Sequence, residues 1–529
     1  MLFQSFSSLL FFVLATRASV GPVTDLRVVN TVLSPDGVSR ETVVVNGQFP
    51  GPLIVGNKGD NFRINVHDDL NDTGLDTATS IHWHGLFQHN TQVLDWPCSM
   101  DTTYSRLVLQ CPIVPGESFL YRFSVPDQAG TYWYHSHYKN QYCDGLRGPL
   151  VIYDPRDPNA HLYDVDDEST VITLADWYQY YSTNAPLGPA QPSTALINGK
   201  GRMAGGSQTE LAIINVDAGK RYRFRLVSIS CDTYFKFSID SHKLAIIEVD
   251  GVNHQQLVVD QIEIFAAQRY SFVLAANQPV SNYWIRADGN NIKGSANDAD
   301  GVSKAILRYN GAPDSFPTSK STVNLPLNEQ DLHPLANAAA PGKPTPGGAD
   351  VNLVLDISLG SMFAVNGTPF VAPDVPVLLQ ILSGAPPDKL LPNGTTFSLP
   401  PNKNIEISIV DLASAALAGP HPVHLHGHVF SVVKSAGNQT YNFENPPQRD
   451  TVSIGGQAND GAVIRFRTDN PGPWFMHCHI DWHLNLGFAA VFVEDQSGIQ
   501  SPHGNTRQAW DQLCPAYNSY MGITTSSSS

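Results

Sequence analysis

Cys478 and the histidines around it carry the strongest chemical signal in the chain, in the run His477-Cys478-His479 with His483 shortly after. In an extended segment successive side chains point to opposite faces, so Cys478 would face one side and its two neighbours the other. A thiolate with two imidazoles is the ligand set of a blue-copper electron-transfer centre, and the second imidazole could be His483 or the distant His421. The run therefore predicts two metal sites that share three consecutive residues.

Pairs of histidines with one residue between them point to the second site. With 18 histidines in 529 residues, a random template gives about 0.6 such pairs, whereas this chain has five. In a strand each pair lies on one face, which suits a cluster of several metal ions. Structural zinc favours closely spaced cysteine and histidine clusters, and cysteine is scarce here. Copper lies above zinc in the divalent affinity order and cycles by one electron, so the pattern favours copper.

Four motifs resemble the copper-binding motifs of the multicopper oxidases, and within that family the chain is most similar to secreted fungal laccases. They are residues 82–85 (HWHG), 135–137 (HSH), 421–427 (HPVHLHG) and 477–483 (HCHIDWH). The likeness extends across nearly the whole mature chain. It implies three cupredoxin-like Greek-key β-sandwich domains. It also implies an enzyme that oxidises phenols and aromatic amines one electron at a time and reduces dioxygen to water with four electrons.

The resemblance further implies four copper ions, namely one type 1, one type 2 and a type 3 pair. The type 1 ligands would be His421, Cys478 and His483, and the type 2 ligands His82 and His424. One type 3 ion would take His84, His135 and His479, and the other His137, His426 and His477. All ten histidines and the cysteine are present, which argues against a relative that kept the fold and lost the chemistry.

The resemblance also assigns roles beside the ligands. His483 would pass electrons from the substrate, and Asp232 matches the residue that hydrogen-bonds a phenol or amine and accepts its proton. A solvated loop aspartate is the plainer interpretation of Asp232. Asp481 would assist proton delivery to dioxygen or have a structural role. Phe488 stands where some members carry an axial methionine; it cannot coordinate, so the type 1 copper would be three-coordinate with a raised potential, and the ring would shield it.

Two other functions stay open at this point. A multicopper oxidase acting on ferrous iron or ascorbate would show acidic iron ligands beside the type 1 site, or an axial methionine. Phe488 argues against the ascorbate type. A copper-binding or electron-carrier protein without turnover would need only the type 1 ligands, so the full set of histidines argues against it.

Composition and repeats predict an all-β chain of several domains. The chain is too long for one ordinary domain, and 41 glycines and 38 prolines supply many turns. Short sequences recur at intervals of domain size: residues 45–47, 197–199 and 365–367, and residues 119–123, 221–225 and 463–467. We expect domains at residues 19–153, 154–318 and 351–529, the last with a C-terminal tail, and a linker at 319–350. Because the first and third domains carry all the histidine motifs, the trinuclear cluster should lie between them.

The N-terminus predicts export. Residues 1–18 resemble a secretory signal peptide, with an apolar run at 9–15 and small residues near Ala18, although no positive charge lies near Met1. A net charge of −16 argues against nucleic acid or an anionic membrane as a partner. We therefore expect a secreted monomer with small substrates. Sequons that fit glycosylation after export lie at Asn71, Asn366, Asn393 and Asn438.

An oxidising compartment makes disulfides plausible. Besides Cys478 the chain has five cysteines, an odd number. The resemblance pairs Cys111 with Cys514 and Cys143 with Cys231, which leaves Cys98. The segment around Cys98 departs from the laccase pattern, either as a real loop or as a gene-model error. That departure also bears on Asp95, which matches an acidic group near the trinuclear cluster.

Overall fold

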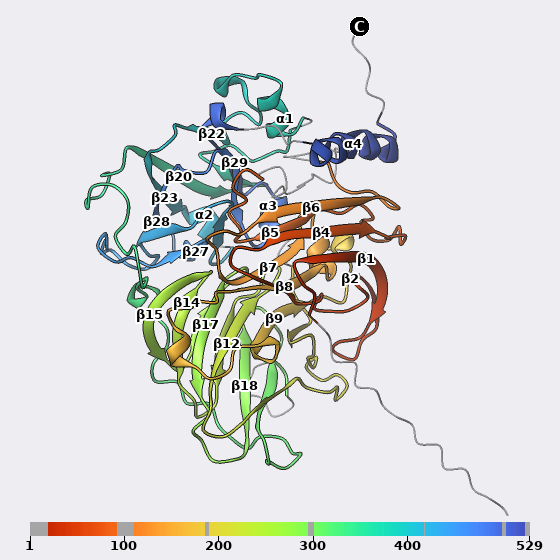
Figure 1. Cartoon of the computed structure of the whole chain (residues 1–529), viewed down its shortest axis with the longest axis vertical. Coiled ribbons are helices and arrows are strands. Elements are labelled where there is room, and N and C mark those ends of the chain that lie inside the picture. The colour runs from red at the N-terminus through yellow and green to blue at the C-terminus, as the bar shows by residue number, and fades with distance from the viewer. Residues whose placement is uncertain are drawn as a thin grey trace, which may run out of the picture.

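The computed structural model describes residues 19–91, 111–185, 190–294, 301–373, 375–416, 418–499 and 504–523. Within these residues the strands form six sheets, two in each of three successive parts of the chain (Figure 1). The expected all-β class is therefore confirmed. The predicted signal peptide, Asp95 and Cys98 lie outside the described residues.

The first domain consists of two four-stranded sheets. In the first sheet the order is β2 (Arg40–Val45), β1 (Val23–Leu33), β4 (Asn61–Asp68) and β6 (Ser118–Ser124). In the second it is β3 (Ile54–Asn57), β8 (Arg147–Tyr153), β7 (Gly130–Ser136) and β5 (Ile81–His84). Burial alternates along β4, as expected for a strand with one face on the core. By contrast, β5 and β7 are buried at every position, so both of their faces are covered.

The second domain pairs a six-stranded sheet with a five-stranded sheet. The larger sheet runs β10 (Thr194–Ile197), β9 (Val171–Trp177), β12 (Arg221–Ser228), β17 (Arg269–Ala275), β14 (Leu244–Val249) and β15 (Val252–Val259). The smaller one runs β11 (Ile213–Val216), β19 (Lys304–Tyr309), β18 (Asn282–Gly289), β13 (Phe235–Ile239) and β16 (Ile262–Ile264). One apolar cluster draws its side chains from both sheets, which makes the domain a β-sandwich.

The third domain repeats this plan. Its larger sheet runs β21 (Phe363–Val365), β20 (Val351–Leu359), β23 (Asn404–Asp411), β28 (Asp460–Arg467), β25 (Phe430–Lys434) and β26 (Gln448–Arg449). Its smaller sheet runs β22 (Thr396–Leu399), β30 (Ala489–Glu494), β29 (Gly472–Cys478), β24 (Pro422–Leu425) and β27 (Thr451–Ser453). Three short helices lie beside these strands: α1 (Val377–Leu382), α2 (Ala413–Ala416) and α3 (Asp481–Asn485).

One of the two sequence repeats marks equivalent positions in the three domains. In each Asn-Gly pair both residues have positive φ, as a type I′ turn requires. The pairs directly follow β2, β10 and β21, which are the strands that pair with β1, β9 and β20. The second repeat, at residues 119–123, 221–225 and 463–467, does not mark equivalent strands in the three domains. Residues 221–225 lie in β12, which pairs in parallel with β9, the first strand of its domain. By contrast, β6 and β28 pair antiparallel with β4 and β23. An alternating pattern fits any half-buried strand, so it cannot specify which one.

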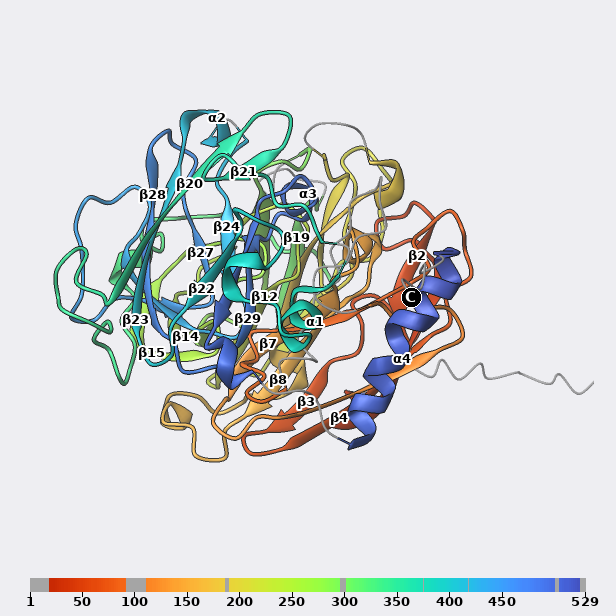
Figure 2. The same cartoon turned by 90° about the horizontal axis from the view of Figure 1, so that it is seen from above.

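The C-terminal tail is a helix, α4 (Gly504–Met521), that returns to the first domain (Figure 2). Its Trp510, Leu513 and Tyr517 join the apolar core of that domain. Between β19 and β20 the chain crosses to the third domain without a strand, through the segment expected as a linker. The exact domain boundaries stay predictions. No helix in the described part of the chain has the length and apolar character needed to cross a membrane.

Candidate metal centres

Eight histidines gather where the first and third domains meet. Their positions follow from strand pairing: His82 of β5 lies opposite His135 of β7, and His424 of β24 lies opposite His477 of β29. Because alternate side chains share a face, the second histidine of each pair faces the same way as the first. The structure thus brings together His82, His84, His135, His137, His424, His426, His477 and His479, all of them buried.

The ring nitrogens of these histidines form three overlapping groups, with all donor atoms of a group within 4.8 Å of one another. The groups are His82, His84 and His424; His84, His135 and His479; and His137, His426 and His477. In the last group Nε2 of His477 lies 3.2 Å from Nε2 of His426 and 3.4 Å from Nε2 of His137. Two of these groups coincide with the predicted type 3 ligand sets, and the third contains both predicted type 2 ligands.

Hydrogen bonds fix which nitrogen of several rings faces the cluster. Nδ1 donates to a backbone carbonyl at 2.8 Å in His135, 2.9 Å in His477 and 2.8 Å in His424. Nε2 is then the lone-pair nitrogen, oriented as in most metal-binding histidines. Among the described residues Nε2 of His135, His424 and His479 has no hydrogen-bond partner although it is buried. Buried imidazole nitrogens without partners fit bound metal ions, which would satisfy their lone pairs.

The electrostatics keep these imidazoles neutral. Burial, followed by repulsion between neighbouring rings, lowers the pKa of His84, His137 and His424 well below the ordinary value for histidine. Neutral imidazole is the form that binds metal, so the site does not have to release protons before it is loaded.

A second, mononuclear group lies at the end of β29. Cys478 Sγ is 3.8 Å from Nδ1 of His421 and 3.7 Å from Nδ1 of His483, and the two nitrogens are 3.1 Å apart. Three donors on one ion, with bonds of roughly 2.0–2.3 Å and ligand angles of about 100–120°, lie about 3.1–3.8 Å apart, so the triangle fits one metal ion. His421 Nε2 donates to the carbonyl of Ala415 at 3.2 Å, which leaves Nδ1 to face the sulfur. The sequence left His483 and His421 as alternatives for the second imidazole beside Cys478, and both belong to this group.

The surroundings of this triangle are apolar. Burial raises the pKa of the Cys478 thiol well above its usual range, so a thiolate there needs a cation beside it. Phe488 is buried, with its ring 5.3 Å from that of His421 and 5.4 Å from that of Phe363. A soft thiolate with two imidazoles and no further ligand at Phe488 fits type 1 copper.

The sequence did not indicate the buried carboxylate of Asp450, which lies behind the histidine cluster. Asp450 Oδ1 lies 3.4 Å from Nε2 of His84 and 3.7 Å from Nδ1 of His424. Arg269 of the second domain donates to both of its oxygens, at 2.7 and 2.6 Å, and to the carbonyl of Thr131 in the first domain. All three domains therefore meet at this ion pair. A single aspartate has no local pattern that would reveal such a role.

The two other predicted functional carboxylates lie near the mononuclear group. Asp232 is half-buried beside Cys231, and burial together with the nearby Asp176 raises its pKa. Asp481 begins α3, the helix that carries His483, and accepts a hydrogen bond from Asn140 at 3.0 Å. Asp481 is thus held by a hydrogen bond, and Asp232 is half-buried rather than fully exposed to solvent.

The structure contains the Cys111–Cys514 and Cys143–Cys231 disulfides. The first ties α4 to the first domain, and the second ties the first domain to the second. Of the predicted glycosylation sites, Asn71, Asn366 and Asn393 are exposed and Asn438 is half-buried. Asn366 sits in a hairpin turn, where its side-chain amide donates to the carbonyl of Val354.

Comparisons with known proteins agree with this geometry. Residues 27–157, 168–312 and 370–498 each match a sequence family described as multicopper oxidase. Laccase-5 of Trametes villosa is 56% identical over 509 residues, which cover 94% of each chain. Among solved structures, a laccase of Botrytis aclada is 30% identical with a TM-score of 0.80, covering 95% of this chain and 93% of its own. Fet3p, a multicopper oxidase that functions in iron import, is 29% identical with a TM-score of 0.79, covering 94% of this chain and 95% of its own. The chain therefore belongs to the multicopper oxidase family.

Proposed function

We propose that this enzyme is a laccase that takes single electrons from phenols and aromatic amines and reduces dioxygen to water. The observation that carries the proposal is the pair of metal centres joined by Cys478, one with three donors and one with eight histidines. When bound, four copper ions supply one-electron oxidation at the first centre and four-electron reduction of dioxygen at the second. The identity to fungal laccases over nearly the whole chain supports the same activity.

The ligand assignment that we propose follows the three histidine groups. His421, Cys478 and His483 hold the type 1 copper, and His82 and His424 hold the type 2 copper. His84, His135 and His479 hold one type 3 ion, and His137, His426 and His477 hold the other. Cys478 lies between two of these histidines in the chain, so the shortest covalent path between the centres runs through its backbone.

The protein residues at the substrate end divide the work of phenol oxidation. His483, partly exposed at the end of the mononuclear group, is the edge where the electron enters. Asp232 holds the phenolic hydroxyl or amine and accepts its proton as the electron leaves. Phe488 keeps water and a fourth donor away from the type 1 site, which favours a high potential.

The context that we propose is extracellular. The leader at residues 1–18 directs export, both disulfides suit an oxidising compartment, and the three exposed sequons are available for glycosylation. A net charge of −16 supports small aromatic substrates rather than nucleic acid or an anionic membrane, and the enzyme acts as a monomer.

Oxygen uptake tests the proposal. Copper-loaded enzyme should consume oxygen with a methoxyphenol faster than with ferrous iron or ascorbate, and uptake with iron alone would contradict the laccase assignment. In Cys478→Ser, the blue absorption and the phenol-driven uptake should both disappear, while copper in the histidine cluster remains. A Cys478→Ser enzyme with full activity would contradict the proposed electron entry point.

A further inference from the structure

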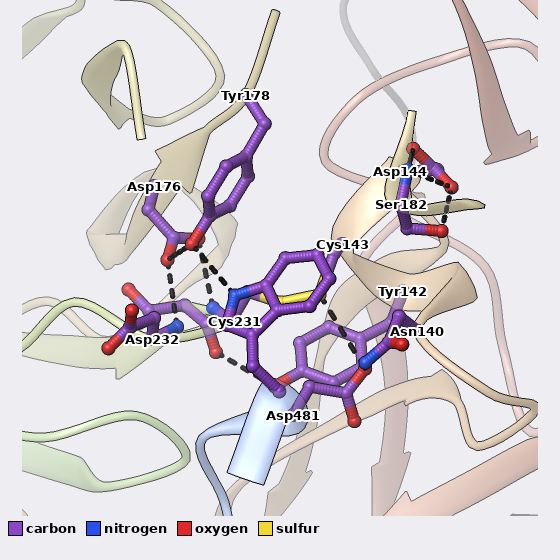
Figure 3. The surroundings of a disulfide bond; sticks show 12 residues. Asn140, Tyr142, Cys143, Asp144, Asp176, Tyr178, Ser182, Cys231, Asp232 and Asp481 are labelled. Carbon is purple, nitrogen blue, oxygen red and sulfur yellow. Dashed lines mark hydrogen bonds between the residues drawn. A yellow bond between two sulfur atoms is a disulfide. The ribbon is translucent and has the colours of Figure 1, made fainter. Parts of the chain in front are cut away.

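A buried aspartate of the second domain holds the segment that carries Asp232. Asp176 lies in β9 and is fully buried. Its carboxylate accepts from three consecutive backbone N–H groups: Cys231 at 2.9 Å, Asp232 at 2.8 Å and Thr233 at 3.2 Å. Figure 3 shows this carboxylate facing the backbone beside the Cys143–Cys231 disulfide. One side chain therefore sets the path of the chain on both sides of Asp232.

The Asp176 carboxylate is itself fixed by two donors. Arg147 of β8, in the first domain, donates from Nη1 at 3.0 Å, and from Nη2 to the Asp176 backbone carbonyl at 2.7 Å. The hydroxyl of Tyr178 donates to the other carboxylate oxygen at 3.0 Å. Neither Arg147 nor Asp176 is exposed, so the pair is held in a site with little screening.

Two contacts connect this anchor to the helix that carries His483. The carbonyl of Cys231 accepts from the backbone N–H of Asp481, the first residue of α3, at 3.0 Å. The Trp482 ring packs edge-on against Tyr178, with ring centres 5.6 Å apart. Asp176 thus contacts the segment of Asp232 directly, and it reaches the helix of His483 through one intermediate residue, either Cys231 or Tyr178.

We propose that Asp176 is a positioning residue that keeps the proton acceptor Asp232 and the electron entry point His483 on the same substrate. The inference rests on the proposed function. As a phenol is oxidised, its O–H bond breaks and the proton moves to a carboxylate oxygen of Asp232. The electron leaves at the edge of His483, one of the three residues that would hold the type 1 copper. The bound coppers would supply the one-electron oxidant, with dioxygen as the final acceptor. This step requires both groups at once, whereas a donor that releases no proton requires only His483.

Kinetics with two different electron donors distinguish a positioning role of Asp176 from a general loss of structure in the variant. In Asp176→Asn, the amide nitrogen replaces an acceptor of Cys231 N–H, or of both Asp232 N–H and Thr233 N–H, so at least one backbone N–H faces a donor and the 231–233 segment shifts. Misplacement of a reacting group by about 1 Å costs up to about 100-fold. We expect kcat/KM for a methoxyphenol to fall at least about tenfold. For ferrocyanide, which gives up an electron and no proton, kcat/KM should stay within about twofold of wild type, with the blue absorption retained.

Asp232→Asn is the matched reference. It should show the same loss with the phenol and spare ferrocyanide. In the Asp232→Asn background, Asp176→Asn should cost little more with the phenol, because residues that act through one another give non-additive effects. If Asp176→Asn leaves Arg147 unpaired and fails to fold, Arg147→Met with Asp176→Asn removes both charges and tests the same prediction.

Each result decides one question. Equal losses with both donors, or fully additive effects of the two substitutions, would show that Asp176 only supports the fold and would overturn the inference. Unchanged phenol kinetics in a folded variant would also overturn it, with the laccase assignment intact. A wild-type enzyme that oxidises ferrocyanide but no phenol would instead overturn the proposed function.

Discussion

The ion pair between Arg269 and Asp450 predicts that one substitution weakens both the domain interface and the copper cluster. In Asp450→Asn, the Arg269 guanidinium loses a bidentate partner at a position where neither side chain is exposed. Breaking a buried pair by removing one partner costs about 3–5 kcal/mol. Arg269 keeps Asp250 at 3.7 Å, so we expect the lower end of that range. A loss of about 3 kcal/mol lowers the ratio of folded to unfolded protein about a hundredfold.

The same substitution changes the surroundings of His84 and His424. Partners that orient metal-binding histidines are typically worth about 10- to 100-fold in metal affinity. Asp450 lies beside both rings, so Asp450→Asn should release copper from the trinuclear cluster at a lower chelator concentration than wild type. The type 1 copper, held elsewhere, should keep its blue absorption.

Asp240→Asn is the control for this prediction. Asp240 is buried and accepts from Arg286 at 2.8 Å through both oxygens, entirely within the second domain. We expect it to lower the unfolding midpoint in denaturant while leaving copper affinity unchanged. Both variants are compared copper-free, because bound metal adds its own stabilisation. The reasoning fails if Asp450→Asn unfolds at the wild-type midpoint, or if Asp240→Asn loses copper as readily as Asp450→Asn.

Two further substitutions test single side chains. Phe488→Met places a thioether beside the type 1 site, so a redox titration should give a lower potential than wild type, and an unchanged potential would mean that the sulfur does not coordinate. The side-chain carboxyl of Asp411 is buried without a hydrogen-bond partner among the described residues, and burial raises its pKa to about 7. Wild-type stability should therefore fall relative to Asp411→Asn as the pH rises from about 4 to 7, because only the unfolded carboxyl ionises freely there. The prediction would be refuted if the free energies of unfolding of wild type and Asp411→Asn differed by the same amount at pH 5 and at pH 8.

The sequence indicated the histidines and the cysteine that the fold brings together better than it indicated the groups that support them. Paired histidines at alternate positions are a local pattern, and strand geometry turns that pattern directly into a shared face. Which histidines share an ion depends on strands from different domains, and spacing alone contains no such information. For those sets the prediction depended on the resemblance to known oxidases.

The supporting residues were missed for a physical reason. Asp450 and Arg269 are 181 residues apart, and Asp176 and Cys231 are 55 apart. Each aspartate is ordinary in its local sequence, and its role comes entirely from the partner that the fold brings to it. The Asn-Gly turns were predictable for the opposite reason, since two consecutive residues with positive φ leave a local requirement in the sequence.

The second domain contributes no predicted copper ligand, yet it contacts the residues that support both centres. Arg269 of that domain compensates the charge of Asp450 behind the histidine cluster. The carbonyl of Cys231 accepts from the first N–H of α3, the helix that carries His483. A shift of the second domain against the third would therefore disturb the charge balance at one centre and the orientation of a ligand at the other. Substitutions between these domains can change either centre without touching a ligand.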